Sequence, residues 1–219
     1  MLFRSWRSLF LAVSVAAWTS AAGADNDIAS TLQQIEDRWT AVRYELKGDK
    51  ERLDAVHSLE RDSQAFMETH PASAESKVWY ALTLLAEAYI RHNASALPLV
   101  KEARRLLEEA ATQPNTMQVQ ILNALGDLYA QVPGWPIAFG SNKTAEEYFK
   151  KAIAADPDGL YNNYLYGDFL EGHGRAREAL EHFEIALKAP PRPGHEKLDG
   201  YRHKEVEEDL AALRRKLKI

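Results

Sequence analysis

Apolar residues recur along most of the chain at spacings of three and four, which is the period of an amphipathic helix, while the alternation typical of strands is almost absent. Stop signals such as Gly48-Asp49, Asp156-Pro157 and Gly172-His173-Gly174 separate the periodic segments. The pattern predicts helices over about 27–47, 51–69, 74–92, 97–113, 117–132, 142–155, 159–172, 175–189 and 200–217. Short connections between these helices indicate an all-α protein.

Two stretches of the chain share one order of residue types: a glycine, then an alanine, a phenylalanine, a second alanine and a closing proline. The positions are Gly126, Ala145, Phe149, Ala152 and Pro157 in one stretch, and Gly167, Ala179, Phe183, Ala186 and Pro191 in the other. Small residues let two helices approach closely, aromatic rings fill the wider gaps beside them, and proline ends the unit. The order therefore predicts stacked helix pairs.

Pro157 and Pro191 are 34 residues apart, and the small–aromatic–small order before each proline resembles the tetratricopeptide (TPR) repeat. The resemblance is strong over about 119–191, weaker over about 75–114 and slight over about 27–71. It implies a helix-turn-helix solenoid of about four helix pairs within residues 25–219. The last predicted helix has one apolar face, which suits a C-terminal capping helix.

One repeat carries an insertion between its two helices. Its glycine and first alanine are 19 residues apart, against 12 in the other repeat, so seven residues are inserted, within the stretch Pro133 to Gly140. Trp135, Ile137 and Phe139 make it too apolar for an ordinary solvated loop. These side chains either lie at the rim of a cavity or in a protein–protein interface, where Trp is enriched, or they fold back over a helix pair. The apolar content favours packing.

The TPR resemblance also implies which residues face the concave side of the solenoid, because the first helix of each pair lines that side. These residues are Gln120, Asn123 and Asp127 in one repeat and Tyr161, Tyr164 and Asp168 in the next. Tyr and Asn combine rigid aromatic surface with hydrogen bonds, a mix suited to recognition. The groove and the core are equally plausible for Tyr161 and Tyr164, whereas Tyr166, next to Gly167, is expected in the core.

The first 24 residues have the layout of a secretory signal peptide. Arg4 and Arg7 precede an apolar run over 8–18, and Ala22 and Ala24 place small residues where a signal peptidase reads them. Cleavage after Ala24 is expected, and the alternative is an uncleaved anchor. No later apolar run approaches the roughly 20 residues of a membrane span, so no stable membrane insertion is expected after cleavage. The cysteine-free, helical composition favours a bacterial periplasm.

Composition and motifs narrow the classes of function. The absence of cysteine removes disulfides, thiol catalysis and zinc–thiolate sites. Without Arg4 and Arg7 the chain has 25 basic and 32 acidic residues, a net charge of −7, and no basic stripe for nucleic acid. Gly140 to Thr144 lacks the Gly-Lys pair of a phosphate-binding loop, and no two histidines have metal-binding helical spacing. We expect no catalytic residues, no metal and no cofactor.

A narrower resemblance concerns the insertion itself. Val-Pro-Gly-Trp-Pro-Ile-x-Phe-Gly before a TPR helix, behind a signal peptide, looks like periplasmic TPR proteins of proteobacteria, which are loosely similar to the T component associated with tripartite (TRAP) transporters. That family implies a helical solenoid with a groove or pore that helps deliver or accept ligands and can self-associate as a trimer. This chain lacks the family's lipid-anchoring cysteine, so the membrane tether and the transporter role do not carry over.

The sequence therefore predicts a periplasmic, non-catalytic TPR-like protein that binds a protein or peptide partner through its concave groove. The residues expected to bind are Gln120, Asn123, Asp127, Trp135, Phe139, Tyr161, Tyr164 and Asp168. The alternative is a small-ligand or metal-binding accessory component of a periplasmic transport system. A homo-oligomer is compatible with either function.

Overall fold

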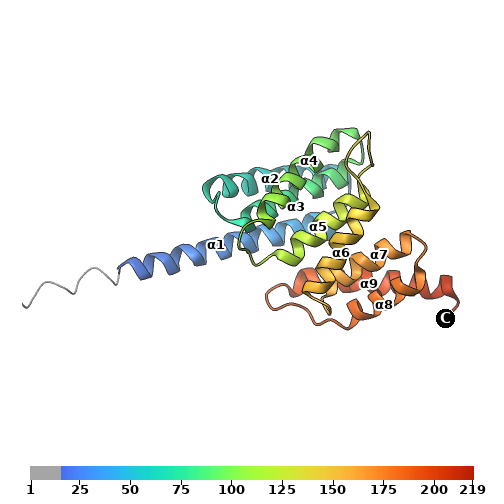
Figure 1. Cartoon of the computed structure of the whole chain (residues 1–219). Helices are drawn as coiled ribbons and strands as arrows, with labels where there is room; N and C mark the ends of the chain where they lie inside the picture. Colours follow the sequence, from blue (N-terminus) through green and yellow to red (C-terminus); the bar gives the residue numbers. More distant parts are fainter. Residues whose placement is uncertain (1–15) are drawn as a thin grey trace, which may run out of the picture.

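The computed structural model describes residues 16–219, with side chains placed from residue 27 onward, and over that range it contains helices and no strand (Figure 1). Residues 1–15 of the expected signal segment lie outside the described residues, and residues 16–24 belong to the first turns of α1 (Ala16–Thr40). A single π-helical turn, η1 (Ala41–Glu45), continues α1 directly.

The remaining helices lie within about two residues of the predicted bounds, except at the start of the last one. They are α2 (Asp49–Thr69), α3 (Ala74–Arg91), the 3-10 turn η2 (Ala94–Ala96), α4 (Leu97–Ala111), α5 (Gln118–Gln131), α6 (Asn142–Ala155), α7 (Leu160–Gly172), α8 (Ala176–Lys188) and α9 (Glu196–Leu217). α9 begins four residues before the predicted start. Asp199 accepts hydrogen bonds from the backbone N–H and the side chain of Arg192, which fixes the entry to this helix ahead of Gly200.

Helices that are neighbours in the sequence pack together in space: α3 with α4, α5 with α6 and α7 with α8, with α2 against α3 and α9 against α8. Figure 1 shows these pairs arranged one after another along the molecule. α5 also packs on α7, so the first helices of the last two pairs lie side by side. The prediction of an all-α protein built from helix pairs is confirmed for the described residues.

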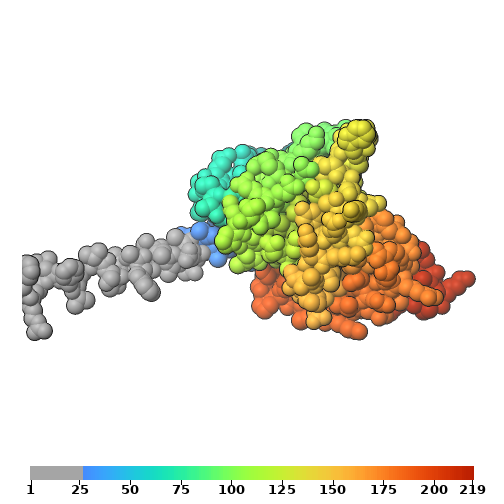
Figure 2. All heavy atoms as spheres, in the orientation of Figure 1, coloured from blue at the N-terminus to red at the C-terminus, as the bar shows by residue number. Residues whose placement is uncertain are grey.

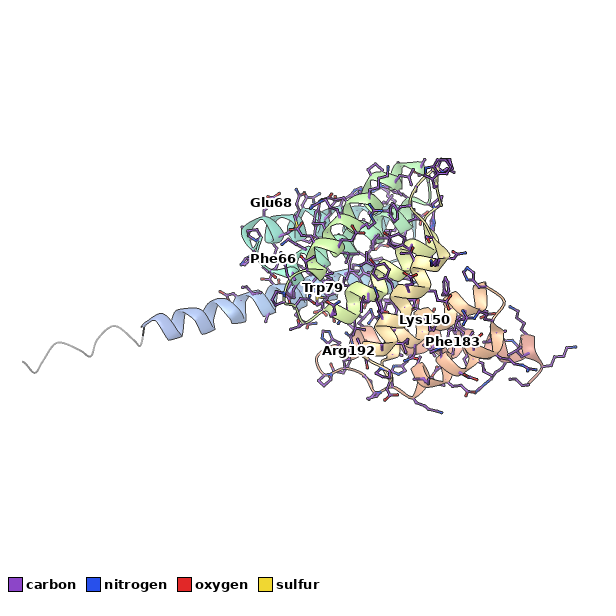
Figure 3. All side chains as sticks on the ribbon, viewed as in Figure 1. Phe66, Glu68, Trp79, Lys150, Phe183 and Arg192 are labelled. Carbon is purple, nitrogen blue, oxygen red and sulfur yellow. The ribbon has the colours of Figure 1, made fainter. Side chains whose placement is uncertain are left out.

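Two glycines set the spacing within these pairs. A Cβ placed on Gly126 would lie 2.7 Å from Cε1 of Phe149, and one on Gly167 would lie 2.7 Å from Cδ1 of Phe183. Both rings are almost completely buried, and Figure 3 labels Phe183 in the packed region between α7 and α8. The close approach that the sequence pattern predicts is therefore present in both pairs.

The last turns of α1 and η1 contact α9 and the segment before it across the array. The Tyr44 hydroxyl of η1 donates to Glu205 of α9 at 3.0 Å, and the Tyr44 and Tyr201 rings stack with centroids 4.9 Å apart. His195, just before α9, lies 2.6 Å from Glu36 of α1 through its Nδ1 atom. α1, η1 and α9 therefore form one continuous cover along the side of the helix pairs.

Gly167→Ala is expected to destabilise the protein by about 1–2 kcal/mol. The added methyl group overpacks the buried Phe183 ring, a cost of roughly 1–3 kcal/mol, and better helix propensity offsets at most about 1 kcal/mol of it. Urea unfolding of the purified variant measures the change. Gly200→Ala is the matched control, because a Cβ there meets nothing within 4 Å, and it should stabilise α9 by about 0.5–1 kcal/mol. Equal effects of the two substitutions would contradict the close packing at Gly167.

Candidate functional site

A cavity of about 510 Å³ lies between the helix pairs and their cover. Residues of α3, α5 and α7, the first helices of the three pairs, line one side of it. The other side is lined by residues of α1, η1, α2, α9 and the segment before α9. Trp79 and Arg192, both labelled in Figure 3, contribute from these two sides. The volume falls in the range of small-molecule sites, roughly 300–1,000 Å³.

All six residues predicted to face the groove line this one cavity: Gln120, Asn123, Asp127, Tyr161, Tyr164 and Asp168. The register inferred for α5 and α7 thus places the expected side chains on the expected face. Asn123 is buried, Gln120, Asp127 and both tyrosines are half-buried, and Asp168 is exposed.

Tyr164 lines the cavity and also packs against the core. Its ring packs against Phe183 with centroids 5.9 Å apart, and its hydroxyl donates to Asp209 of α9 at 2.9 Å. Burial, with the negative charges of Glu205 and Asp209, raises the pKa of this hydroxyl, so it stays protonated and donates. Tyr166 is buried against Phe149, as predicted.

The cover supplies two arginines that the sequence interpretation did not select. Arg202 of α9 is only 7% exposed, and its guanidinium carbon lies 3.7 Å from the centroid of the Tyr161 ring. Arg43 of η1 lies 3.2 Å from Glu205 and close to the Tyr89 ring. A signal for Arg202 does exist, since it is four residues from both Leu198 and Val206 and thus on the apolar face of its helix. No comparable sequence signal marks Arg43.

A single buried carboxylate holds two arginines at the edge of the cavity. Asp199 is fully buried, and its Oδ1 lies 2.8 Å from Arg192 Nη2 and 3.4 Å from Arg202 Nη1. Burial acts to raise the pKa of Asp199, but the hydrogen bonds and charge of Arg192 outweigh it and hold this pKa below its usual range. One negative charge therefore compensates two positive charges here.

On α5 and α7, in contrast to Asp199, two carboxylates have a raised pKa. Burial raises the pKa of Asp127 to about 6, the negative charge of Asp168 adds to the shift, and the hydrogen bond from Gln131 with the charge of Arg43 opposes it. Burial and the charges of Asp209 and Glu171 also raise the pKa of Asp168. Within the described residues, neither carboxylate lies at ion-pair distance from a basic side chain.

Two buried polar atoms of the cavity have no hydrogen-bond partner among the described residues: Asn123 Oδ1 and Arg202 Nε. Leaving such a group unpaired costs about 1–3 kcal/mol, so native proteins rarely keep one without a reason. Both atoms are also shielded from solvent, so a molecule in the cavity would reach them only if these side chains moved.

The inserted loop lies apart from this cavity. Trp135 is 89% exposed and Ile137 is 65% exposed, so the prediction that Trp135 folds back over the helices is wrong. Phe139 does pack, with its ring 5.3 Å from that of Tyr129 and 4.3 Å from the Arg104 guanidinium. Neither Trp135 nor Phe139 lines the cavity, so of the two functional alternatives the rim of this cavity is excluded and the protein–protein interface stays a prediction.

Hydrogen bonds at the neck of the loop explain this division. The Gly140 N–H donates to Pro133 O at 3.0 Å, and the Ser141 N–H donates to Tyr129 O at 2.8 Å. These bonds close the loop at its base, next to Phe139, and direct its tip away from the helices. Figure 2 shows the tip as the yellow projection at the upper right.

Among the described residues, no group of three or more His, Asp or Glu side chains is placed to hold a metal ion. Across the same residues, no helix combines the length and the apolar character needed to cross a membrane.

Asp127→Asn is expected to raise stability at pH 7 by roughly 1–3 kcal/mol and to leave it unchanged near pH 4. The folded-state pKa of about 6 lies above the usual aspartate value of about 3.9, so the folded protein binds more protons between these values and wild-type stability falls as pH rises through this window. Asparagine stays neutral and can still accept the hydrogen bond from Gln131.

The measurement is chemical unfolding of wild type and variant from pH 4 to pH 7. Glu208→Gln, which removes an exposed carboxylate of α9, is the control and should leave the pH profile unchanged. A stability difference between Asp127→Asn and wild type that stays constant with pH would contradict the raised pKa.

Comparison with known proteins adds no assignment: no protein-family model matches this sequence, and no curated protein matches it. The functional inference therefore depends on the residues of the cavity and of the exposed loop.

Proposed function

We propose that the protein is a TPR-like solenoid of the periplasm that binds a small ligand in its concave cavity and catalyses no reaction. The single observation that carries this proposal is the convergence of all six predicted groove residues with Arg43 and Arg202 on one cavity of about 510 Å³. The resemblance to transporter-associated TPR proteins makes an accessory role in ligand delivery the natural context.

Two features support the solenoid interpretation. The Gly126–Phe149 and Gly167–Phe183 contacts are equivalent in consecutive helix pairs, as expected for a structural repeat. α9 packs on α8 with buried Val206, Leu210 and Leu213, as a capping helix would. In such an array the first helices face the concave side, which is where α3, α5 and α7 line the cavity.

The cover favours a compact ligand over a long peptide in this cavity. A polypeptide that runs along a solenoid groove needs an open path beside the first helices. Here α1, η1 and α9 line the facing side, and the His195–Glu36 and Tyr44–Glu205 contacts tie this cover together. The resulting space has the size of a small-molecule site, and its walls combine aromatic rings with polar and charged side chains.

Gln120→Trp is expected to abolish ligand retention. Gln120 lines the cavity and is half-buried, so an indole in its place would occupy ligand volume. Mature protein is incubated with a small-molecule extract of periplasm, and bound molecules are measured by native mass spectrometry after gel filtration. Glu147→Trp, an equally bulky change at an exposed position of α6, is the control and should bind as wild type does.

Wild type should retain at least one small molecule, and the affinity of Gln120→Trp for it should fall by more than about tenfold, equivalent to 1.4 kcal/mol. Equal retention by Gln120→Trp would place the ligand elsewhere. If wild type retains nothing, the proposal of small-ligand binding is rejected.

A second candidate function, binding of a protein partner, is favoured by the exposed tip of the inserted loop. Monomeric proteins seldom hold a Trp at 89% exposure beside an exposed Ile, and Trp is the residue most enriched among interface hot spots. A partner of this loop would offer an apolar pocket for the indole of Trp135. This candidate requires no occupant in the cavity, so both functions can coexist.

Trp135→Ala is expected to remove partner binding without loss of stability. Truncation of a hot-spot Trp costs about 2–4 kcal/mol of binding free energy, whereas an exposed side chain contributes within about 0.5 kcal/mol to folding. Pulldown from periplasmic extract, quantified against wild type, measures the first effect, and thermal unfolding measures the second. Ile219→Ala, at another exposed apolar residue, should leave capture unchanged; equal capture by wild type and Trp135→Ala would exclude the loop.

A further inference from the structure

Opposite charges of the cavity are carried by different elements. Asp127 of α5 and Asp168 of α7 provide the negative charge, and the charge of Asp168 acts on Asp127. Arg43 is near enough to influence Asp127, but its own ion pair is with Glu205, at 3.2 Å. In the described part of the chain, the two carboxylates thus have no ion-pair partner of their own.

Arg43 of η1 and Arg52 of α2 bring positive charge to the cavity, and Arg192 and Arg202 add more at the start of α9. Arg192 and Arg202 share Asp199, so the three side chains together have one excess positive charge. Arg192 makes the shorter contacts with Asp199, at 2.8 and 3.0 Å, and Arg202 makes a single one of 3.4 Å. Arg202 therefore has hydrogen-bonding capacity that the described residues do not use.

The two unpaired buried atoms have complementary chemistry. Asn123 Oδ1 is an acceptor in a side chain that is 3% exposed, one helical turn before Asp127 on the same face of α5. Arg202 Nε is a donor in a side chain that is 7% exposed. Both atoms are shielded from solvent, so they indicate unmet polarity in the cavity wall and are not direct contact points for a ligand.

Tyr161 lines the cavity together with Asp127 and Arg202. Arg202 stacks on its ring at 3.7 Å, and burial raises the pKa of its hydroxyl while the charges of Arg202 and Asp127 act on it in opposite directions. The Tyr164 ring, 6.1 Å from that of Tyr161, extends the aromatic wall.

We infer that the ligand of this cavity is a small zwitterion, an amino acid or a short peptide, whose ammonium group binds at Asp127 and Asp168 and whose carboxylate binds Arg202. This inference rests on the proposed ligand-binding function. A ligand with a cation alone would leave the excess positive charge at Arg202 unmatched, and a ligand with an anion alone would leave the two carboxylates unmatched. A zwitterion can form charge-assisted hydrogen bonds both with the carboxylates of α5 and α7 and with the arginine of α9.

The inference is tested with ligands that differ only in charge. L-phenylalanine and L-alanyl-L-phenylalanine are zwitterions with two separations between ammonium and carboxylate, and both carry a ring for the aromatic wall. 2-Phenylethylamine keeps only the ammonium group, and 3-phenylpropionate keeps only the carboxylate. Isothermal titration calorimetry with the mature protein should show at least one zwitterion binding about tenfold or more tightly than either singly charged analogue.

Two variants then assign the charges. Asp127→Asn should weaken binding of the zwitterion and of the amine by about tenfold and leave binding of 3-phenylpropionate unchanged. Arg202→Gln should weaken binding of 3-phenylpropionate and leave binding of the amine unchanged. Arg177→Gln, on the exposed side of α8, is the control and should change nothing. The comparison of analogues on wild-type protein remains decisive if Arg202→Gln does not fold.

Several outcomes would overturn the inference. One is that neither zwitterion binds, and another is that a singly charged analogue binds as tightly as its zwitterion. A third is that Asp127→Asn leaves zwitterion affinity unchanged. If, in any of these cases, wild type retains a small molecule from the extract that Gln120→Trp does not retain, the proposed ligand-binding function stands, and only the ligand class is wrong.

Discussion

The contact of a buried phenylalanine ring with a helical glycine controls the geometry on which the cavity depends. At Gly126 and Gly167 the opposing rings lie where any Cβ would be. The two helices of each pair can therefore approach more closely than helices separated by side chains, and the same distance recurs in consecutive pairs. Because the spacing is repeated, α5 and α7 lie side by side and present equivalent residues to the same side. Asp127 and Asp168 come to line the same cavity in this way.

The cavity also requires charged groups to be buried, and their pairing decides which of them are available to a ligand. A buried charge is costly unless it is paired and hydrogen-bonded. Asp199 meets this requirement with Arg192, which leaves Arg202 only partly satisfied. On the facing helices, Asp127 has a hydrogen bond from Gln131 and no direct ion pair. The folded protein thus keeps unmatched charge in its interior, where a ligand with complementary charge would gain most.

The inserted loop illustrates how one apolar segment is divided between stability and exposure. Phe139, next to the hydrogen-bonded neck, packs against Tyr129 and Arg104. Trp135 and Ile137, at the tip, have no helix surface within reach and remain exposed. The expectation that apolar residues bury something was correct only for the residue that the neck holds against α4 and α5. The cavity and the loop tip are therefore separate candidate surfaces with different chemistry.

The sequence by itself determined the helices and one face of the cavity. Helical periodicity and stop signals mark the elements, and the resemblance to the TPR repeat implies the register that places Asn123, Asp127, Tyr161 and Asp168 together. These features depend on contacts within one repeat of about 34 residues, and such contacts leave a pattern in the sequence. Only the tertiary structure placed Arg43 and Arg202 opposite them. Glu205 and Tyr44 are 161 residues apart, and contacts of that range leave no periodic signal in the chain. The direction of Trp135 was likewise decided by the hydrogen bonds that close its loop, because composition shows how apolar a segment is and not which surface lies within its reach.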